Sequence, residues 1–319
     1  MKCTNRTHHL KIKLLCISCI AALFMNGCGT GKTADIQNPY SLTGDNSSVS
    51  NQFFARNLCV TNDINFGTDQ VHADYAEGAG VFDLTTKEVL YSQNLFEKLY
   101  PASTTKILTA YIIIRNCDLD DKVTVSADAI ANMADSSKCG LAAGDVLTVR
   151  DLLYGLLLVS GNDAANVLAE YYSGSIDKFA EEMNREAKAL GATQSHFVNA
   201  NGLPDPNHYT SAHDMALIMQ ECIKNETFCR IESDLTYTIQ PTNMTSTPRD
   251  LQNHHALLFQ DGQWGYKGAF AGKTGYTDEA HNTLVTAAKR GNMTLVCVVL
   301  TCDNLDYIND TRTVLDFGY

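Results

Sequence analysis

The segment "PASTTK" contains a serine and a lysine whose types and spacing suit nucleophilic catalysis. Ser103 and Lys106 lie three residues apart at the start of an apolar run of helical length, so they share one helix face. A serine hydroxyl is a poor nucleophile until a base removes its proton. A lysine can be that base when burial and neighbouring cations keep it neutral. Taken alone, the pair is more typical of an ordinary helix start with one solvated lysine.

The segment "LLLVSGNDAAN" places further polar side chains at a junction between two apolar helices. Ser160 and Asn162 follow one long apolar helix and precede another. Polar side chains at such a turn either cap a helix or face a cleft. Asp163 is predicted to cap the second helix. This leaves Ser160 and Asn162 available to a cleft.

The segment "GKTGY" supplies a second lysine. Lys273 and Thr274 lie on a predicted strand between Gly272 and Gly275, and a glycine in a strand often marks the close approach of another backbone. The Gly-Lys-Thr sequence also occurs in phosphate-binding loops, which need a further glycine five residues earlier, between a strand and a helix. An earlier copy in "GCGTGKTAD" has Asn26 at that position and no preceding strand. It is therefore not interpreted as a nucleotide site.

The elements that must position these residues follow a recognisable order. Residues 78–94 are predicted as two strands around a Thr-Thr-Lys turn, and "AFAGKTGYT", "NTLVTAAKR" and "MTLVCVVLT" as three more, the last two joined by a Gly-Asn turn. Helices dominate the middle of the chain, with N-caps predicted at Thr148, Ser175 and Ser211. A final helix is predicted in "LDYINDTRTVLDFGY". This order predicts an antiparallel sheet built from both ends of the chain, with a mostly helical insertion.

The first 27 residues differ in composition from the rest. Four basic residues and no acid precede "LLCISCIAALFM", an apolar run that is short for a membrane span and typical of a secretory signal. The run ends in "FMNGC", so we predict a lipoprotein-type signal peptide over 1–27 and a lipid-bearing cysteine at Cys28. Gly27 fits this pattern, whereas Met25 and Asn26 depart from it; ordinary cleavage and a retained anchor are the alternatives. Residues 28–71 are predicted as a flexible tether and 72–319 as the folded domain.

Composition narrows the function classes. The chain is 45% hydrophobic, 19% of its residues are charged and no long run of one sign occurs, which argues against a mostly disordered protein. The formal net charge of −12 argues against a nucleic-acid partner, since that partner requires a basic stripe. Of the 11 cysteines, the seven that follow Cys28 form no paired or histidine-bearing ligand spacing, so no zinc site is expected. Free thiols and one or two disulfides are both compatible with this number.

The three motifs in this order, Ser-x-x-Lys, Ser-x-Asn and Lys-Thr-Gly, resemble the signature of the penicillin-recognising serine enzymes. The blocks "YPASTTKILTA", "TVRDLLYGLLLVSGNDAANVLAE", "FAEEMNREAKALGATQSHFVNANGL", "HYTSAHDMAL" and "GKTGYTDEAHNTLV" resemble those of the D-alanyl-D-alanine carboxypeptidases, the low-molecular-mass penicillin-binding proteins. The resemblance covers 72–319. It implies an α+β fold of the β-lactamase/transpeptidase type, with the sheet flanked by helices and a mostly helical inserted subdomain.

The resemblance also implies catalytic roles. Ser103 would attack the carbonyl between the two terminal D-alanines of a peptidoglycan stem pentapeptide, with Lys106 as general base. Ser160 would relay a proton to the departing D-alanine, and Asn162 would position the acyl chain and the lysine. Water would then hydrolyse the acyl-enzyme, with no metal or organic cofactor.

Substrate binding is implied at the third motif. Lys273 and Thr274 would hold the terminal carboxylate of the substrate, so the lysine would bind a carboxylate and not a phosphate. The amides of Ser103 and Tyr276 would form the oxyanion hole, and Gly275 and Tyr276 would belong to the substrate-binding residues. β-Lactam antibiotics would be covalent inhibitors acting on the same serine.

The implied location is the outer face of the cell membrane, with attachment through a lipid on Cys28, or secretion if that cysteine is not lipidated. Many members of the family carry a second, all-β domain and a C-terminal amphipathic helix that docks on the membrane. This sequence stops at "VLDFGY", where the catalytic domain would end, so we expect attachment to depend on the N-terminus.

Three other interpretations are weighed. A class A β-lactamase carries a deacylating glutamate about 36 residues after its Ser-x-Asn motif; the corresponding segment "GATQSHFVNANGLPDPNHYT" contains Asp205 and no glutamate. A zinc-dependent peptidase is disfavoured because "SAHD" is followed by no paired histidine motif. A non-catalytic sensor or scaffold would acylate without turnover, and endopeptidase or transpeptidase activity depends on the shape of the cleft.

Overall fold

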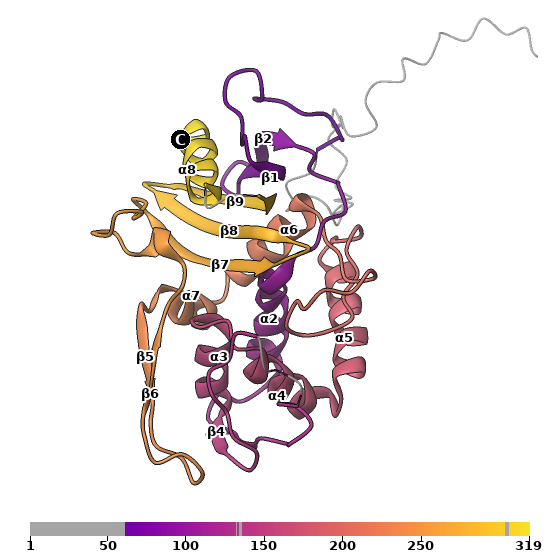
Figure 1. The fold of residues 1–319 in the computed structure, drawn as a ribbon. Coiled ribbons are helices and arrows are strands. Elements are labelled where there is room, and N and C mark those ends of the chain that lie inside the picture. Colours follow the sequence, from indigo (N-terminus) through magenta and orange to yellow (C-terminus); the bar gives the residue numbers. More distant parts are fainter. Residues whose placement is uncertain (1–60, 132, 134–135, 304–305) are drawn as a thin grey trace, which may run out of the picture. The chain divides into compact units, whose positions relative to one another are not determined.

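The computed structural model describes residues 61–131, 133, 136–303 and 306–319. Its centre is a five-stranded sheet in the order β2-β1-β9-β8-β7, in which all neighbouring strands are antiparallel (Figure 1). The strands are β1 (Ala76–Asp83), β2 (Glu88–Gln93), β7 (Ala269–Thr277), β8 (His281–Arg290) and β9 (Met293–Cys302). The predicted signal peptide, Cys28 and most of the predicted tether lie outside the described residues.

The two ends of the folded chain meet within this sheet, because β1 pairs with β9 along its length. Strands β1 and β2 are joined by a turn in which Lys87 has φ 67°, and β8 and β9 by a turn in which Gly291 has φ 58°. Six consecutive residues at the centre of β9 are buried, as in a strand covered on both faces. The predicted sheet, built from both ends of the chain, is confirmed.

Helices cover both faces of the sheet (Figure 1). On one face, α8 (Tyr307–Gly318) packs on β9, β1 and β8. On the other, α6 (Ala212–Cys222) packs on β9, with α2 (Lys106–Asn116) behind it. The first eight residues of α2 are all buried, so this helix is a core element and not an amphipathic surface helix. A short 3₁₀ helix, η2 (Ala102–Thr105), leads directly into α2.

The inserted segment is mostly helical, as predicted. It contains α3 (Val149–Leu157), α4 (Asn162–Ser173), α5 (Ile176–Ala189), α6 and α7 (Glu226–Ser233). The predicted N-caps are confirmed, since the side chains of Thr148, Ser175 and Ser211 accept hydrogen bonds from backbone N–H groups at the starts of α3, α5 and α6. Two small antiparallel pairs were not predicted: β3 (Lys122–Thr124) with β4 (Val146–Thr148), and β5 (Thr236–Ile239) with β6 (Arg249–Gln252).

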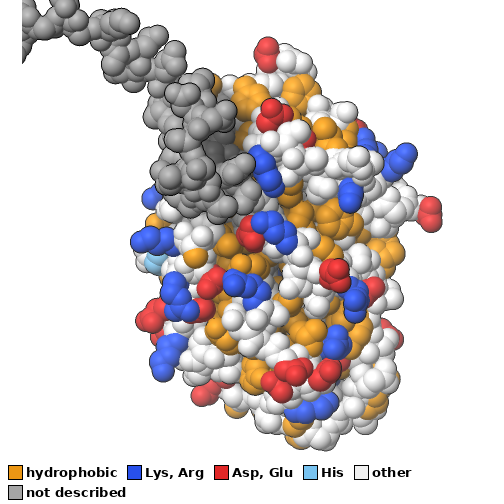
Figure 2. All heavy atoms as spheres, turned by 180° about the vertical axis from the view of Figure 1, so that it is seen from behind, with side chains coloured by type: hydrophobic (Ala, Val, Ile, Leu, Met, Phe, Trp, Pro, Cys, Tyr) orange, Lys and Arg blue, Asp and Glu red, His pale blue; other side chains and the backbone are white. Residues whose placement is uncertain are grey.

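Surface charge and the cysteines are the two features that were addressed from composition. On the face drawn in Figure 2, lysine and arginine side chains are interspersed with aspartate and glutamate, and no continuous basic stripe crosses that face. Among the described residues, no helix is long and apolar enough to cross a membrane. Six cysteines in the described part of the chain are free thiols: Cys117, Cys139, Cys222, Cys229, Cys297 and Cys302. The alternative of free thiols therefore holds for these six.

Candidate active site

Ser103 and Lys106 lie where η2 meets α2, as the first motif predicted. Ser103 is partly exposed, whereas Lys106 is completely buried. The lysine Nζ lies 2.8 Å from Ser103 Oγ, 2.7 Å from Asn162 Oδ1 and 2.6 Å from the backbone oxygen of Asn201. The first motif and the second motif are therefore joined by one buried amine. The backbone that presents the serine is unusual, because Ala102 has φ 47°.

The surroundings of Lys106 suit a neutral amine. The oxygens of Asn162 and Asn201 are acceptors only, whereas the hydroxyl of Ser103 can accept or donate. A neutral amine has two N–H donors and one lone pair, so it can donate to both acceptors and take the hydroxyl proton of Ser103. Burial holds the pKa of Lys106 well below its usual range, and the positive charge of Lys273 lowers it further. A neutral amine at this position can accept a proton and so can act as a base.

Ser160 and Asn162 come from the turn between α3 and α4. Ser160 is 5% exposed, and its φ of 60° is in the left-handed region, which is uncommon for a residue with a side chain. Its buried Oγ has no hydrogen-bond partner among the described residues. A strained backbone and an unpaired buried hydroxyl are both costly, and such features persist mainly where function requires them.

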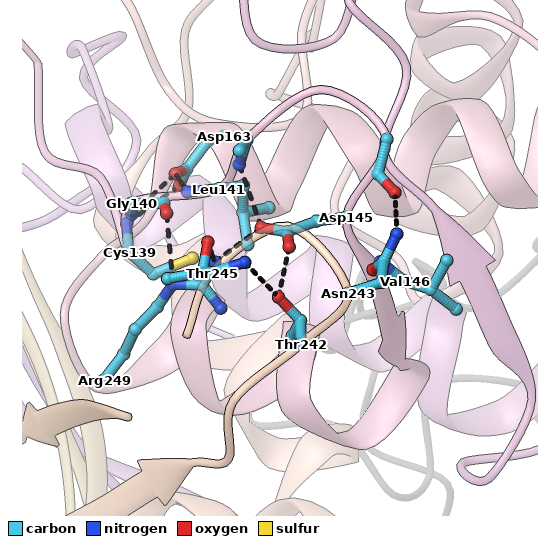
Figure 3. Close-up of polar contacts among 12 residues, drawn as sticks. Cys139, Gly140, Leu141, Asp145, Val146, Asp163, Thr242, Asn243, Thr245 and Arg249 are labelled. Carbon is cyan, nitrogen blue, oxygen red and sulfur yellow. Dashed lines mark hydrogen bonds and ion pairs between the residues drawn. The ribbon is translucent and has the colours of Figure 1, made fainter. Parts of the chain in front are cut away.

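Asp163 does not have the predicted role. The N-cap residue of α4 is Gly161, which lacks a capping side chain. The carboxylate of Asp163 instead accepts hydrogen bonds from the N–H groups of Cys139 (3.0 Å), Gly140 (3.0 Å) and Leu141 (3.1 Å), as Figure 3 shows. It also accepts one from its neighbour's N–H. The prediction was wrong because the loop supplies three backbone N–H groups that need an acceptor, and bonding all three satisfies more donors than capping the helix would.

The loop held by Asp163 continues into a buried ion pair. Arg249, on β6, bonds the carboxylate of Asp145 and the backbone oxygen of Gly140 (Figure 3). Thr242 donates to the same Asp145 carboxylate. The loop over residues 137–145 is therefore fixed between α4 and the β5–β6 hairpin. It reaches the motif itself, because the N–H of Asn162 donates to the backbone oxygen of Ser137 (2.8 Å).

Strand β7 brings the third motif beside the nucleophile. A Cβ atom added to Gly275 would lie 2.8 Å from the backbone nitrogen of Ser103 and 2.4 Å from Thr283 Oγ1. Only glycine fits there, so the edge of β7 lies directly against η2. Lys273 is 1% exposed and Tyr276 is 60% exposed, so the strand runs from the interior to the rim of the site. Thr274 and Gly275 lie between them and are partly exposed.

Several residues around these motifs were not predicted. Asn201 contributes its backbone oxygen to Lys106, and its side chain donates to Asn166 on α4 (3.0 Å). Gly202 is required next to it, because its φ is 89° and a Cβ would lie 1.8 Å from the backbone oxygen of Ala102. His208 is buried and lies 2.9 Å from Thr105. The Asn-Gly pair in "NANGL" was the available signal, since such pairs mark positions with positive φ.

The site and fold together define a class of protein. A buried lysine bonded to a serine at the start of a core helix, beside the edge strand of an antiparallel sheet with helices on both faces, is the arrangement of the serine-type penicillin-binding fold. Solved structures confirm this fold. The DD-transpeptidase of Streptomyces K15 superposes with a TM-score of 0.70 at 31% identity, covering 76% of this chain and 97% of that protein. A D-alanyl-D-alanine carboxypeptidase from Mycobacterium tuberculosis gives a TM-score of 0.70 at 33% identity.

The D-alanyl-D-alanine carboxypeptidase family model matches residues 66–304, and the chain belongs to this family. It is 36% identical over 248 residues to DacB2 of Mycobacterium tuberculosis, covering 75% of this chain and 80% of that protein. It is also 36% identical over 253 residues to DacF of Bacillus subtilis, covering 77% of this chain. The match spans 63% of the length of DacF. The recognition of the family and its fold from the sequence is confirmed.

Proposed function

We propose that this protein is a serine-type D-Ala-D-Ala carboxypeptidase that removes the terminal D-alanine from peptidoglycan stem pentapeptides through an acyl-enzyme on Ser103. The observation that supports this most is the buried amine of Lys106, which lies 2.8 Å from the serine hydroxyl and has a strongly lowered pKa. A serine with such a base can be acylated near neutral pH. Membership of the family supplies the substrate class.

Acylation begins with attack by Ser103 Oγ on the carbonyl carbon of the penultimate D-alanine, while the neutral Nζ of Lys106 takes the hydroxyl proton. The N–H groups of Ser103 and Tyr276 stabilise the oxyanion that forms, and they do so mainly in the transition state. The carbon–nitrogen bond then breaks, and Ser160 passes a proton to the nitrogen of the departing D-alanine. The unpaired Oγ of Ser160 supports this relay. Water hydrolyses the ester and regenerates the serine.

Substrate orientation is assigned to β7. Lys273 and Thr274 bind the terminal carboxylate, while Gly275 allows the strand to lie against the nucleophile. Asn162 accepts a hydrogen bond from Lys106 through its side-chain oxygen, and it also positions the acyl chain of the substrate. β-Lactam antibiotics carry the same combination of carbonyl and carboxylate, so they acylate Ser103. None of these steps requires a metal ion or an organic cofactor.

The test is release of D-alanine from a stem pentapeptide, measured with and without penicillin. Ser103→Ala should abolish D-alanine release and covalent labelling by a fluorescent penicillin together. Removing one member of a nucleophile–base unit should cost about 10³-fold or more in turnover. The matched control is Ser233→Ala, an exposed serine on α7, which should change neither activity. Labelling that survives in Ser103→Ala would contradict the assignment.

The fate of the acyl-enzyme separates this proposal from its alternatives. The similar Streptomyces protein is named a DD-transpeptidase. In transpeptidation, an amine replaces water as the acceptor of the acyl group. Adding a D-amino acid to the assay and measuring the exchanged product distinguishes the two. Asp205 is engaged in a turn, where it accepts a hydrogen bond from the N–H of Asn207 (2.7 Å), which disfavours a role as a deacylating base. We therefore expect the penicilloyl adduct to persist for minutes. Rapid hydrolysis of the adduct would indicate a β-lactamase. Covalent labelling by penicillin without any release of D-alanine from the pentapeptide would indicate a non-catalytic sensor.

We also propose that the enzyme acts outside the cytoplasm, as the cell-wall enzymes of its family do, and is held at the outer face of the membrane by a lipid on Cys28. The support is the leader over 1–27, with its basic start, its short apolar run and the cysteine at its end. Residues 28–71 then form the tether of the catalytic domain over 72–319.

A further inference from the structure

A completely buried carboxyl group lies behind the third motif, outside the residues assigned to catalysis. Glu232, on α7, is 0% exposed, and its Oε2 accepts a hydrogen bond from the N–H of Gly272 at 3.3 Å. Its other oxygen, Oε1, has no hydrogen-bond partner among the described residues. Charged groups are almost never fully buried unless they are paired. This carboxyl group therefore requires an explanation.

The group of opposite charge is in the next residue of the strand. Lys273 is 1% exposed, and its Nζ donates a hydrogen bond to the backbone oxygen of Thr274 (2.9 Å). An ammonium has three donors. Burial lowers the pKa of Lys273, and the carboxylate of Glu232 opposes this shift. Burial likewise raises the pKa of Glu232 to about 8, and Lys273 opposes that shift. The carboxylate therefore forms in the pH range in which Lys273 would otherwise lose its proton. Each group thus favours the charged form of the other.

The backbone between the two groups is held closely. A Cβ atom on Gly272, whose φ is 155°, would lie 2.2 Å from the backbone oxygen of Val285 and 2.5 Å from His255 Nε2. His255 is itself buried and bonded to Thr286 Oγ1 at 2.9 Å. The N–H of Gly272 therefore presents a fixed donor to Glu232, which fixes the carboxyl group beside the lysine's strand.

Other titratable groups near this pair do not supply a negative charge. Burial lowers the pKa values of His254 and His255, with Lys273 as the second cause, so both imidazoles are neutral near pH 7. Burial raises the pKa values of the Cys222 and Cys229 thiols, which lie near Glu232 on α6 and α7. On the side of the nucleophile, Lys106 faces Lys273, and its own pKa is lowered by burial and by that lysine.

We propose that Glu232 is a positioning residue for the reaction, because it is the buried counter-charge that keeps Lys273 in its ammonium form for the carboxylate of a stem peptide or a β-lactam. The inference rests on the proposed role of Lys273 in substrate binding. Removing one of two opposite charges that are buried near each other leaves the other charge uncompensated, and a lysine responds by losing its proton. A neutral Lys273 would still donate hydrogen bonds but would lose its attraction for a carboxylate.

The decisive variant is Glu232→Gln. Glutamine can accept the hydrogen bond from Gly272 and matches the shape of a protonated glutamic acid, so it removes the charge and little else. The rate constant for acylation by a fluorescent penicillin should be measured from pH 5.5 to 10. We expect its alkaline limb, which reports loss of the proton from Lys273, to move down by at least one pH unit. On the alkaline limb, a shift of one pH unit makes acylation at subsaturating penicillin about tenfold slower than in the wild type. The affinity for penicillin should fall, whereas the rate constant at saturating penicillin should not change.

Two further variants make the result specific. Glu232→Asp keeps the charge and should restore most of the wild-type alkaline limb. Asp310→Asn removes another buried carboxylate, which accepts a hydrogen bond from the N–H of Tyr75 (3.0 Å) and lies on α8, on the opposite face of the sheet. It should leave the alkaline limb unchanged. An unchanged limb in Glu232→Gln, or an equal shift in all three variants, would overturn the proposal.

The role of Glu232 and the role of Lys273 can fail separately. With a penicillin methyl ester, the wild-type protein should show no alkaline limb, because no carboxylate is present for Lys273 to bind. A limb that persists with the ester would contradict the role of the lysine and overturn the proposal with it. If the acid penicillin shows the limb and the ester does not, but Glu232→Asp shifts it as far as Glu232→Gln, only the inference on Glu232 fails. D-alanine release measured in parallel tests the proposed function itself.

Discussion

Replacement of Asp163 by asparagine should both destabilise the protein and change the pH dependence of acylation. The two carboxylate oxygens accept hydrogen bonds from the N–H groups of Cys139, Gly140 and Leu141 and from that of Ala164. An asparagine side chain has one acceptor oxygen, and its NH₂ group would face backbone donors. If the oxygen keeps the Oδ1 position, the N–H groups of Gly140 and Leu141 lose their acceptor.

The size of the first effect follows from these two lost bonds. A buried donor without a partner costs about 1–3 kcal/mol, so Asp163→Asn should lower the free energy of unfolding by roughly 2–6 kcal/mol. Denaturation in urea, followed by circular dichroism, measures this change. The matched control is Asp177→Asn, because Asp177 is the second residue of α5 as Asp163 is of α4, but it is exposed. It should change the unfolding free energy by less than about 0.5 kcal/mol.

The second effect concerns the base. The pKa of Lys106 is lowered by burial and then by Lys273, while the negative charge of Asp163 opposes both. Removing that charge lowers the pKa of Lys106 further. Because the amine acts as a base only when neutral, the acid limb of acylation by penicillin should move to lower pH. An acid limb that moves to higher pH would refute the assignment of Lys106 as the base, and an unchanged stability would refute the account of the loop.

Further predictions concern the nucleophile, the strand and the leader. Lys106→Arg should be inactive towards penicillin at every pH from 6 to 10, because a guanidinium keeps its proton in this range. In the wild-type protein, the acid limb of acylation should lie well below about 10.4, the pKa of a free lysine. An active arginine variant would contradict the mechanism. Gly275→Ala should slow acylation by about 10²–10³-fold, as when one oxyanion donor is lost. The reason is that the new methyl group would press on the backbone nitrogen of Ser103. An acylation rate within twofold of wild type, with an unchanged melting temperature, would refute the close approach of β7. Cys28→Ser should prevent incorporation of labelled fatty acid and leave unprocessed precursor, and normal lipid incorporation would exclude Cys28 as the acceptor.

The elements that carry strong local signals could be predicted from the sequence. Thr148, Ser175 and Ser211 precede apolar periodic segments, and each caps a helix as expected. The turns at Lys87 and Gly291 also lie where the flanking residues indicated, because turn preferences depend on a few neighbouring residues. The strands β5 and β6 could not be predicted in this way. They are short and mostly polar, and their pairing depends on contacts between distant segments.

The site was predicted as far as side-chain type carries information. Ser103, Lys106 and Asn162 were recognised from their motifs, and the structure brings them together around one amine. The third partner of that amine is the backbone oxygen of Asn201, 95 residues away in the sequence. Every residue has such an oxygen, so no residue type indicates it. Glu232 was missed for a related reason, since one glutamate in a helix is ordinarily a solvated side chain.

The pairing of β1 with β9 has a consequence for the time at which the enzyme becomes reactive. Lys106 and Ser103 are synthesised early, but Lys273 is 170 residues from Ser103, and β7 is held in the sheet only through β8 and β9. Contacts this far apart in sequence form late in folding, after the intervening chain is available. An exported chain should therefore emerge without a working nucleophile and become sensitive to penicillin only when residues 293–302 have joined the sheet.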